Sequence, residues 1–221
     1  MSPEALSAQR LYGDVRRAIM TGAFRPGEPL VTSHIAEQFG TSVSPVRDVL
    51  HRLSGEELVE AQELGGFTVP SLDPVRIGHL YRWQAEITYL VTRSAPNLSD
   101  ISDAHIEAID PCEGSGQLTP VQLAYASGRL FMALVSLSDN PEHVSALTRL
   151  DARIHLVRCH EAVLGRCHGE LLSLREHLRS GNRHRARTGL WHYHRRRLLN
   201  VSRIFAALAA AGYARQETDM P

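Results

Sequence analysis

Two short helical patterns separated by a polar turn lie near the N-terminus, and they constrain the fold more than any other feature of the chain. The first helix is predicted to begin at a Thr32 or Ser33 cap and to end at Gly40. Beyond the turn, Ser44 is a suitable N-cap, and Pro45 suits the first helical position because no N–H is needed there. Two helices joined by such a turn favour a helix-turn-helix, whose second helix enters the major groove of DNA.

The second of these helices is amphipathic and is followed by two extended runs. Its apolar residues recur at i, i+3, i+4 and i+7, as expected of a face that packs inward; they are Val46, Val49, Leu50 and Leu53. Arg47 belongs to the opposite, polar face. Residues 58–61 and 66–69, joined through 62–65, are typical of a small β-hairpin. With a preceding helix over residues 6–21, these elements predict a winged helix-turn-helix.

The proline-containing segment 71–74 is predicted to be a linker between two domains. A length of 221 residues suits two domains better than one. Residues 1–70 then form the winged helix-turn-helix domain, and residues 75–221 form an all-α helical bundle, so the fold is predicted to be mainly α. The helices of the bundle are expected over residues 75–95, 101–109, 119–138, 141–163, 166–180 and 183–211.

The charge of the chain removes one common argument for DNA binding. All 24 cationic residues are arginines, and the formal net charge is zero. Residues 1–72 carry 6 arginines against 9 acidic residues, a net charge of −3, so no bulk basic patch marks this domain. The prediction of DNA binding therefore rests on the motif and not on the charge.

Several other classes of protein are not expected. The N-terminus lacks the pattern of a signal peptide and no apolar run approaches the ~20 residues that span a bilayer, so we expect a cytoplasmic protein without a membrane partner. The cysteines Cys112, Cys159 and Cys167 form no C-x-x-C pair and are expected to be reduced. No nucleophile elbow, P-loop or H-E-x-x-H motif occurs, so an enzyme is not expected.

Several separated motifs together resemble the GntR family of bacterial regulators. These motifs are residues 19–30, 35–40, 42–50, Leu53 and 66–69. In that family the recognition helix and the wing tip contact the operator. The resemblance therefore implies a set of DNA-contacting residues: Ser33, Ser42, Val43, Ser44, Arg47, Gly65 and Gly66.

Within this set, Arg47 can reach guanine or a phosphate, and Ser44 can donate to a phosphate beside the positive end of the helix. Val43 departs from the family, which often has Arg at this position. Losing a guanine reader predicts an altered operator preference, with apolar contact to a thymine methyl group. The alternative for Arg47 is a surface ion pair with Asp48 or Glu37.

The C-terminal domain resembles the FCD effector domain of FadR-like regulators through Arg82 and Glu86 and through its helix junctions at 139–141 and 181–182. Many FCD domains hold a divalent metal through one Asp and three His side chains. The matching positions here are Ser127, Phe131, Leu171 and Tyr193. The resemblance thus predicts that the family-type metal site is lost and that no cofactor is bound. A rearranged site formed by His168, His192 and His194 stays open as an alternative.

Without a metal, an effector is predicted to bind by other means. Arg82 can pair bidentately with an anionic group, and Phe131 and Tyr193 make the cavity more aromatic. The alternative for Arg82 is a buried ion pair with Glu86.

The predicted function follows from the two resemblances. We expect a homodimeric repressor that binds a palindromic operator in double-stranded DNA and is modulated by a small-molecule effector, anionic or partly apolar. The alternative is an effector-independent or partner-regulated DNA-binding protein whose effector site has degenerated.

Overall fold

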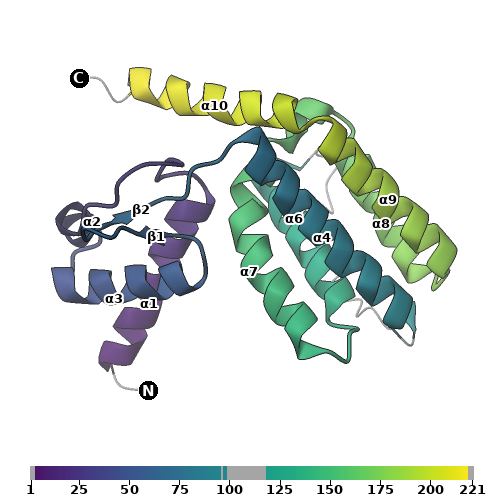
Figure 1. The fold of residues 1–221 in the computed structure, drawn as a ribbon, viewed down its shortest axis with the longest axis horizontal. Helices are drawn as coiled ribbons and strands as arrows, with labels where there is room; N and C mark the ends of the chain where they lie inside the picture. Colours follow the sequence, from purple (N-terminus) through teal and green to yellow (C-terminus); the bar gives the residue numbers. More distant parts are fainter. Residues whose placement is uncertain (1–2, 96, 99–117, 219–221) are drawn as a thin grey trace. The chain divides into compact units, whose positions relative to one another are not determined.

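The computed structural model describes residues 3–95, 97–98 and 118–218. The chain divides into two compact units, with the boundary between Leu72 and Asp73. Figure 1 shows helices throughout both units and one small antiparallel hairpin in the first. The predicted mainly α fold, with a winged helix-turn-helix followed by a helical domain, is confirmed. Each unit has its own buried apolar core.

The N-terminal unit contains α1 (Pro3–Met20), α2 (Thr32–Gln38), α3 (Val43–Gly55), β1 (Glu60–Ala61) and β2 (Phe67–Thr68). The strands pair with Glu60 opposite Thr68 and Ala61 opposite Phe67. The residues predicted to form the inward face of the second helix are all buried. They pack against α1 and α2, and this packing holds the two helices of the motif together.

Both helix starts in the motif differ from the prediction. The N-cap of α3 is Ser42 and not Ser44, so Pro45 is the third residue of the helix. Proline is tolerated there because the first four N–H groups of a helix have no acceptor within the helix. The N-cap of α2 is Val31, and Thr32 is already helical. Neither cap residue makes a side-chain hydrogen bond to the helix, so the side-chain preference that guided the prediction does not decide these boundaries.

The C-terminal unit contains α4 (Pro74–Ser94), α6 (Pro120–Val135), α7 (Pro141–Arg158), the 3₁₀ helix η2 (Glu161–Leu164), α8 (Cys167–Arg179), α9 (Arg183–Leu199) and α10 (Val201–Thr218). Helix α4 packs against α6, α7 and α9, while α8 packs against α9. Short polar caps set several of the helix starts. The carboxylate of Asp73 accepts from the N–H of Arg76, and the amide oxygens of Asn140 and Asn182 act in the same way on α7 and α9.

Two predicted helices are interrupted. The helix expected over 141–163 ends at Arg158 and is followed by the separate 3₁₀ helix. The helix expected over 183–211 breaks at Asn200, whose side-chain amide donates to the carbonyl of Arg196 while its own carbonyl accepts from Ile204. Apolar spacing does not register such a break, because the hydrogen bonds of a single asparagine both end one helix and start the next. The helix predicted over 101–109 lies outside the described residues.

Among the helices of the described ranges, none is long and apolar enough to cross a membrane.

Candidate nucleic-acid interface

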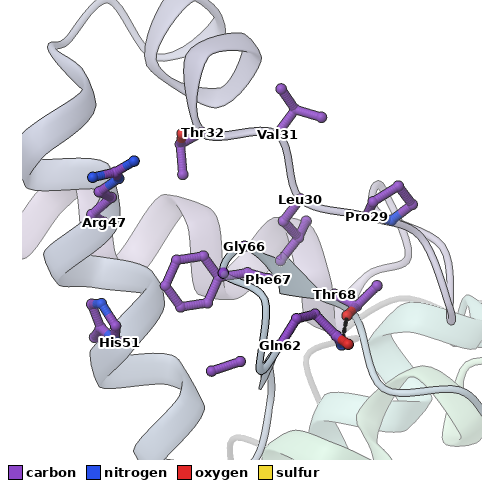
Figure 2. A pocket seen from close by; sticks show the side chains of 12 residues that line it. Pro29, Leu30, Val31, Thr32, Arg47, His51, Gln62, Gly66, Phe67 and Thr68 are labelled. Carbon is purple, nitrogen blue, oxygen red and sulfur yellow. Dashed lines mark hydrogen bonds between the residues drawn. The ribbon is translucent and has the colours of Figure 1, made fainter.

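A cleft of about 670 Å³ lies between α3 and the wing. Figure 2 shows Arg47 and His51 on one side of it, with Phe67 of β2 and the segment from Pro29 to Thr32 around it. Arg47 and His51 are one helical turn apart, so their side chains follow each other along the same face of α3. The cleft is therefore bounded by the polar face of the predicted recognition helix.

The wing is held by an aromatic contact to α3 and by backbone hydrogen bonds to the segment that precedes α2. The rings of His51 and Phe67 meet edge to face, with centroids 4.9 Å apart. The N–H of Leu30 donates to the carbonyl of Phe67 at 2.7 Å, and the N–H of Val69 donates to the carbonyl of Glu28 at 2.9 Å. These bonds fix the hairpin from its outer edge, which places the wing tip at a defined position beside the helix.

The tip of the wing depends on two glycines. Gly65 and Gly66 have φ angles of 88° and 97°, a backbone region that side chains with a Cβ rarely adopt. A Cβ at either position would meet nothing within 4 Å, so glycine is needed there for the backbone conformation and not for close packing. The exposed tip can thus approach a nucleic-acid groove closely.

A carboxylate anchors the other end of α3. The hydroxyl of Tyr12 donates to Glu56 Oε1 at 2.6 Å, and Arg16 Nε lies 3.6 Å from Glu56 Oε2. The guanidinium of Arg52 lies 3.7 Å from the centre of the Tyr12 ring. Burial, followed by the hydrogen bond to Glu56, raises the pKa of Tyr12, so its hydroxyl stays a donor. These contacts tie the end of α3 to α1 and hold the helix in place.

All seven residues expected to contact DNA are exposed: Ser33, Ser42, Val43, Ser44, Arg47, Gly65 and Gly66. The structure brings Arg47, Gly65 and Gly66 together around the cleft, and the other four lie outside its lining. Within the described part of the chain, no ion pair joins Arg47 to Asp48 or Glu37.

His51 and Gln62 line the same cleft and were not among the expected residues. The side-chain amide of Gln62 donates to the hydroxyl of Thr68. The position of His51 four residues after Arg47 was the available signal, because residues four apart share one face of a helix.

The sequence pattern described as bacterial regulatory proteins, gntR family, matches residues 7–69, which cover α1 to β2. Residues 7–69 form a GntR-family DNA-binding domain. The protein is accordingly a DNA-binding transcription regulator and not an enzyme.

Its relatives extend beyond that domain. The chain is 24% identical over 154 residues to the HTH-type transcriptional regulator YdhC of Bacillus subtilis (strain 168), covering 67% of this chain and 68% of that protein. It is 29% identical over 101 residues to the HTH-type transcriptional regulator McbR of Escherichia coli (strain K12), covering 45% and 46%. Among solved structures, a transcriptional regulator GntR from Rhodococcus sp. RHA1 has a similar fold, with a TM-score of 0.72 at 21% identity over 90% of this chain and 98% of that chain.

In the helical unit of the regulator, the three residues expected to bind an effector separate. Phe131 of α6 and Tyr193 of α9 are fully buried, with ring centroids 5.0 Å apart. Arg82 and Glu86 of α4 are both exposed, so Arg82 does not join the two aromatic residues and forms no buried pair with Glu86.

The four positions that match a family-type metal site, Ser127, Phe131, Leu171 and Tyr193, are all buried. They offer one hydroxyl and one phenol, a poor donor set for a divalent ion. Across the described ranges, no three His, Cys, Asp or Glu side chains are grouped to hold a metal. The alternative set is not assembled either, because His194 is buried while His192 on the same helix is exposed.

The burial of charged side chains in this interior was not predicted from the sequence. Arg197 is 1% exposed and donates to Glu161 through Nε and Nη2, at 3.0 and 2.8 Å, and to Glu170 through Nη1 at 2.6 Å. Glu161 also accepts from the hydroxyl of Tyr81 at 2.6 Å. The spacing of Tyr193 and Arg197, four apart on α9, was the available signal that Arg197 shares the inward face.

Proposed function

We propose that the regulator represses transcription by binding a two-fold symmetric operator as a homodimer, and that a small molecule bound in its helical domain modulates this binding. The observation that carries the proposal is the cleft between α3 and the wing, with Arg47 free of any ion pair with Asp48 or Glu37 among the described residues. A guanidinium presented in this way can pair with guanine or with a phosphate.

The start of α3 supports the same function. Ser42, Val43 and Ser44 are exposed in or beside its first turn, where free N–H groups and the helix dipole favour a phosphate. Val43 presents an apolar surface at the position where the family often has Arg. We therefore expect the operator to place a thymine methyl near Val43, and a selected site identical to the usual GntR-type half-site would contradict this.

The small size of the DNA-contacting part, formed by α3 and the wing tip, supports the proposed homodimer. One short helix and one wing tip cover only part of a helical turn of DNA, and two copies related by a two-fold axis double the contacts. We assign dimerisation and effector binding to the helical unit, which resembles an FCD domain. Its interior supports effector binding through polar side chains that lie deep in the bundle.

The first experiment measures binding to the DNA upstream of the regulator's own gene by fluorescence anisotropy, at several fixed salt concentrations. We expect sequence-selective binding that Arg47→Ala weakens by about 10- to 100-fold. The matched control is Arg93→Ala, which removes the same charge from an exposed position on α4 and should leave the affinity unchanged. Equal losses in both variants, or equal binding to scrambled DNA, would contradict the proposed reading of DNA by Arg47.

Dimerisation and modulation are tested separately. Sedimentation equilibrium should give twice the mass of one chain. A measured mass equal to that of one chain would contradict the homodimer. A regulator whose DNA affinity responds to no metabolite would favour the effector-independent alternative, for which the apolar residues Phe131 and Leu171 at two metal-ligand positions are the supporting observation.

A further inference from the structure

The outer surface of α9 carries an excess of positive charge. The helix contains six arginines and no aspartate or glutamate among its 17 residues. Arg187 and Arg195 are exposed, and among the described residues no carboxylate pairs with either of them. The surface of a helix usually mixes both signs of charge, because an arginine is stabilised by a carboxylate three or four residues away. The positive charge of this surface is therefore available to a partner.

A tryptophan lies between the two exposed arginines. Arg187, Trp191 and Arg195 follow one another at intervals of four residues, so their side chains lie on one face of α9. Trp191 is 46% exposed, and the guanidinium carbon of Arg195 lies 5.1 Å from the centre of its ring. Tryptophan and arginine are among the residue types that most often dominate the binding energy of protein interfaces. This row of side chains therefore has the composition of an interface.

Helix α4 packs beside α9 and runs in the opposite direction (Figure 1). At the start of α9, Arg183 donates to the carbonyl of Thr92 at 3.0 Å. Further along α9, Nε2 of His194 lies 3.3 Å from Oγ1 of Thr88. Successive residues of α9 therefore lie beside progressively earlier residues of α4.

The exposed side of α4 continues the same surface. Arg82, Glu86 and Tyr89 are spaced by four and three residues, so they lie on one face of the helix. Tyr89 connects the two rows, because its hydroxyl donates to the carbonyl of Arg187 at 3.4 Å and its ring centre lies 5.5 Å from the Arg187 guanidinium carbon. Arg82 and Glu86 are exposed, and no ion pair of either is found in the described ranges. The two rows form one surface, here called the α4–α9 face: Arg82, Glu86, Tyr89, Arg187, Trp191 and Arg195.

We propose that the α4–α9 face binds an acidic amphipathic helix of another protein. Two carboxylates of that helix pair with Arg187 and Arg195, and an apolar side chain midway between them covers Trp191. Positions eight residues apart are separated by about 12 Å along any α-helix, so acidic residues at positions i and i+8 match the two arginines. This binding is independent of the proposed operator reading, homodimer and effector.

The charges of the α4–α9 face favour an acidic protein over two other occupants. A second copy of the chain would bring the same excess of arginines against this face, and like charges across an interface are costly. A nucleic-acid strand carries one phosphate per ~3.4 Å along its axis, so it would also bring negative charge to Glu86. A protein helix can place a neutral or basic side chain opposite Glu86 and acidic side chains opposite the arginines.

The test uses the fluorescence of Trp191 in the full chain. Trp83 is the other of the two tryptophans, so Trp83→Phe leaves Trp191 as the only one. The probe is an alanine-based helical peptide of about 18 residues that contains Glu-x-x-x-Leu-x-x-x-Glu. It should shift the emission of Trp191 to shorter wavelength in a saturable way, and more weakly as salt is raised. The same peptide with both glutamates replaced by lysine should have no effect.

The strength of binding decides the outcome. We expect a dissociation constant below about 1 mM at low salt. The absence of a saturable change with the acidic peptide up to that concentration would overturn the proposal, and so would an equal response to the lysine peptide.

A charge-reversal variant assigns the binding to the α4–α9 face. Combined with Trp83→Phe, the pair Arg187→Glu and Arg195→Glu should weaken binding of the acidic peptide by about 10-fold or more. The same variant should gain binding of the lysine peptide, which also shows that it is folded. Arg149→Glu, at an exposed position on α7, is the matched control and should bind the acidic peptide like the parent. Unchanged binding of the acidic peptide by the charge-reversal variant would contradict the assignment.

Two further measurements detect the other occupants. Sedimentation equilibrium should give the same mass for the wild type and the charge-reversal variant, and a changed mass would show that this face joins two copies. A single-stranded oligothymidylate should bind more weakly than the acidic peptide. Tighter binding of the oligothymidylate that the charge reversal abolishes would show a nucleic-acid contact. Either result would overturn the proposal, while operator binding that fails to depend on Arg47 would leave it intact.

Discussion

Asp151 and Arg158 lie two turns apart on α7 and are joined by a hydrogen-bonded ion pair of 2.5 Å, directly against the backbone of α6 at Gly128. A Cβ at Gly128 would lie 2.7 Å from Asp151 Oδ1 and 3.2 Å from Arg158 Nη1. The pair can occupy this position only because the facing helix lacks a side chain there.

Gly128→Ala should therefore destabilise the helical unit. We expect a loss of about 1–3 kcal/mol in the free energy of unfolding, since the added methyl group must displace the ion pair. Gly169→Ala on α8 is the matched control, because a Cβ there meets nothing within 4 Å, and it should be neutral or stabilising by up to about 1 kcal/mol. Urea unfolding followed by circular dichroism measures both, and equal effects would refute the steric argument.

Alanine at the wing tip should also destabilise the fold, because of backbone strain and not because of a steric clash. Gly66→Ala is expected to lower the free energy of unfolding by about 1 kcal/mol, because the φ of 97° is strained for a residue with a Cβ. Gly13→Ala, in the interior of α1 with open space around it, should instead stabilise by about 0.5–1 kcal/mol. Opposite signs in the same denaturation experiment would support the argument, and a stabilised Gly66→Ala variant would contradict it.

The buried carboxylate of Glu161 should contribute more to the stability of the fold than the hydroxyl of its partner Tyr81. Glu161→Gln leaves the buried Arg197 with a weakened partner, and we expect a loss of about 3–5 kcal/mol. Tyr81→Phe removes only one hydrogen bond to a charged group, which is expected to cost about 1.5–3 kcal/mol. Chemical denaturation at pH 7 compares the two variants. A Tyr81→Phe variant that loses as much stability as Glu161→Gln would show that the ion pair is not the larger contribution.

His194 should make the stability depend on pH. Its pKa is lowered to about 3 in the folded chain, while the unfolded chain has the ordinary value of about 6.5. Between these values the unfolded state binds the extra proton, so stability is lost as the pH falls below about 6.5, by about 1.4 kcal/mol per pH unit. Unfolding free energies measured from pH 7 to pH 5 should fall less steeply in His194→Gln. The exposed His192→Gln should keep the wild-type dependence, and an unchanged slope in His194→Gln would refute the assignment.

Much of the N-terminal domain could be predicted from the sequence because its signals are local. The spacing of Val46, Val49, Leu50 and Leu53 defines the inward face of α3 wherever the rest of the chain lies. The glycines of the wing are required by the backbone of their own turn. Among the expected DNA-contacting residues, Arg47, Gly65 and Gly66 surround one cleft, while the remaining four are exposed outside it. The boundaries of the elements were misplaced by one to three residues, and at the starts of α2 and α3 the caps found there make no side-chain bond.

The interior of the helical domain was decided by tertiary structure. Arg195, Arg196 and Arg197 are consecutive arginines, and the spacing of four residues between Tyr193 and Arg197 singles out Arg197 only if Tyr193 is known to face inward. Arg197 is buried because Glu161, 36 residues earlier, meets it from the 3₁₀ helix and repays part of the cost of removing its charge from water. Arg158 is buried because Gly128 on another helix leaves room for its pair with Asp151. The sequence by itself determined most of the helices and turns, because those depend on neighbours along the chain. The choice of which charged side chains enter the core depends on partners that only folding brings near.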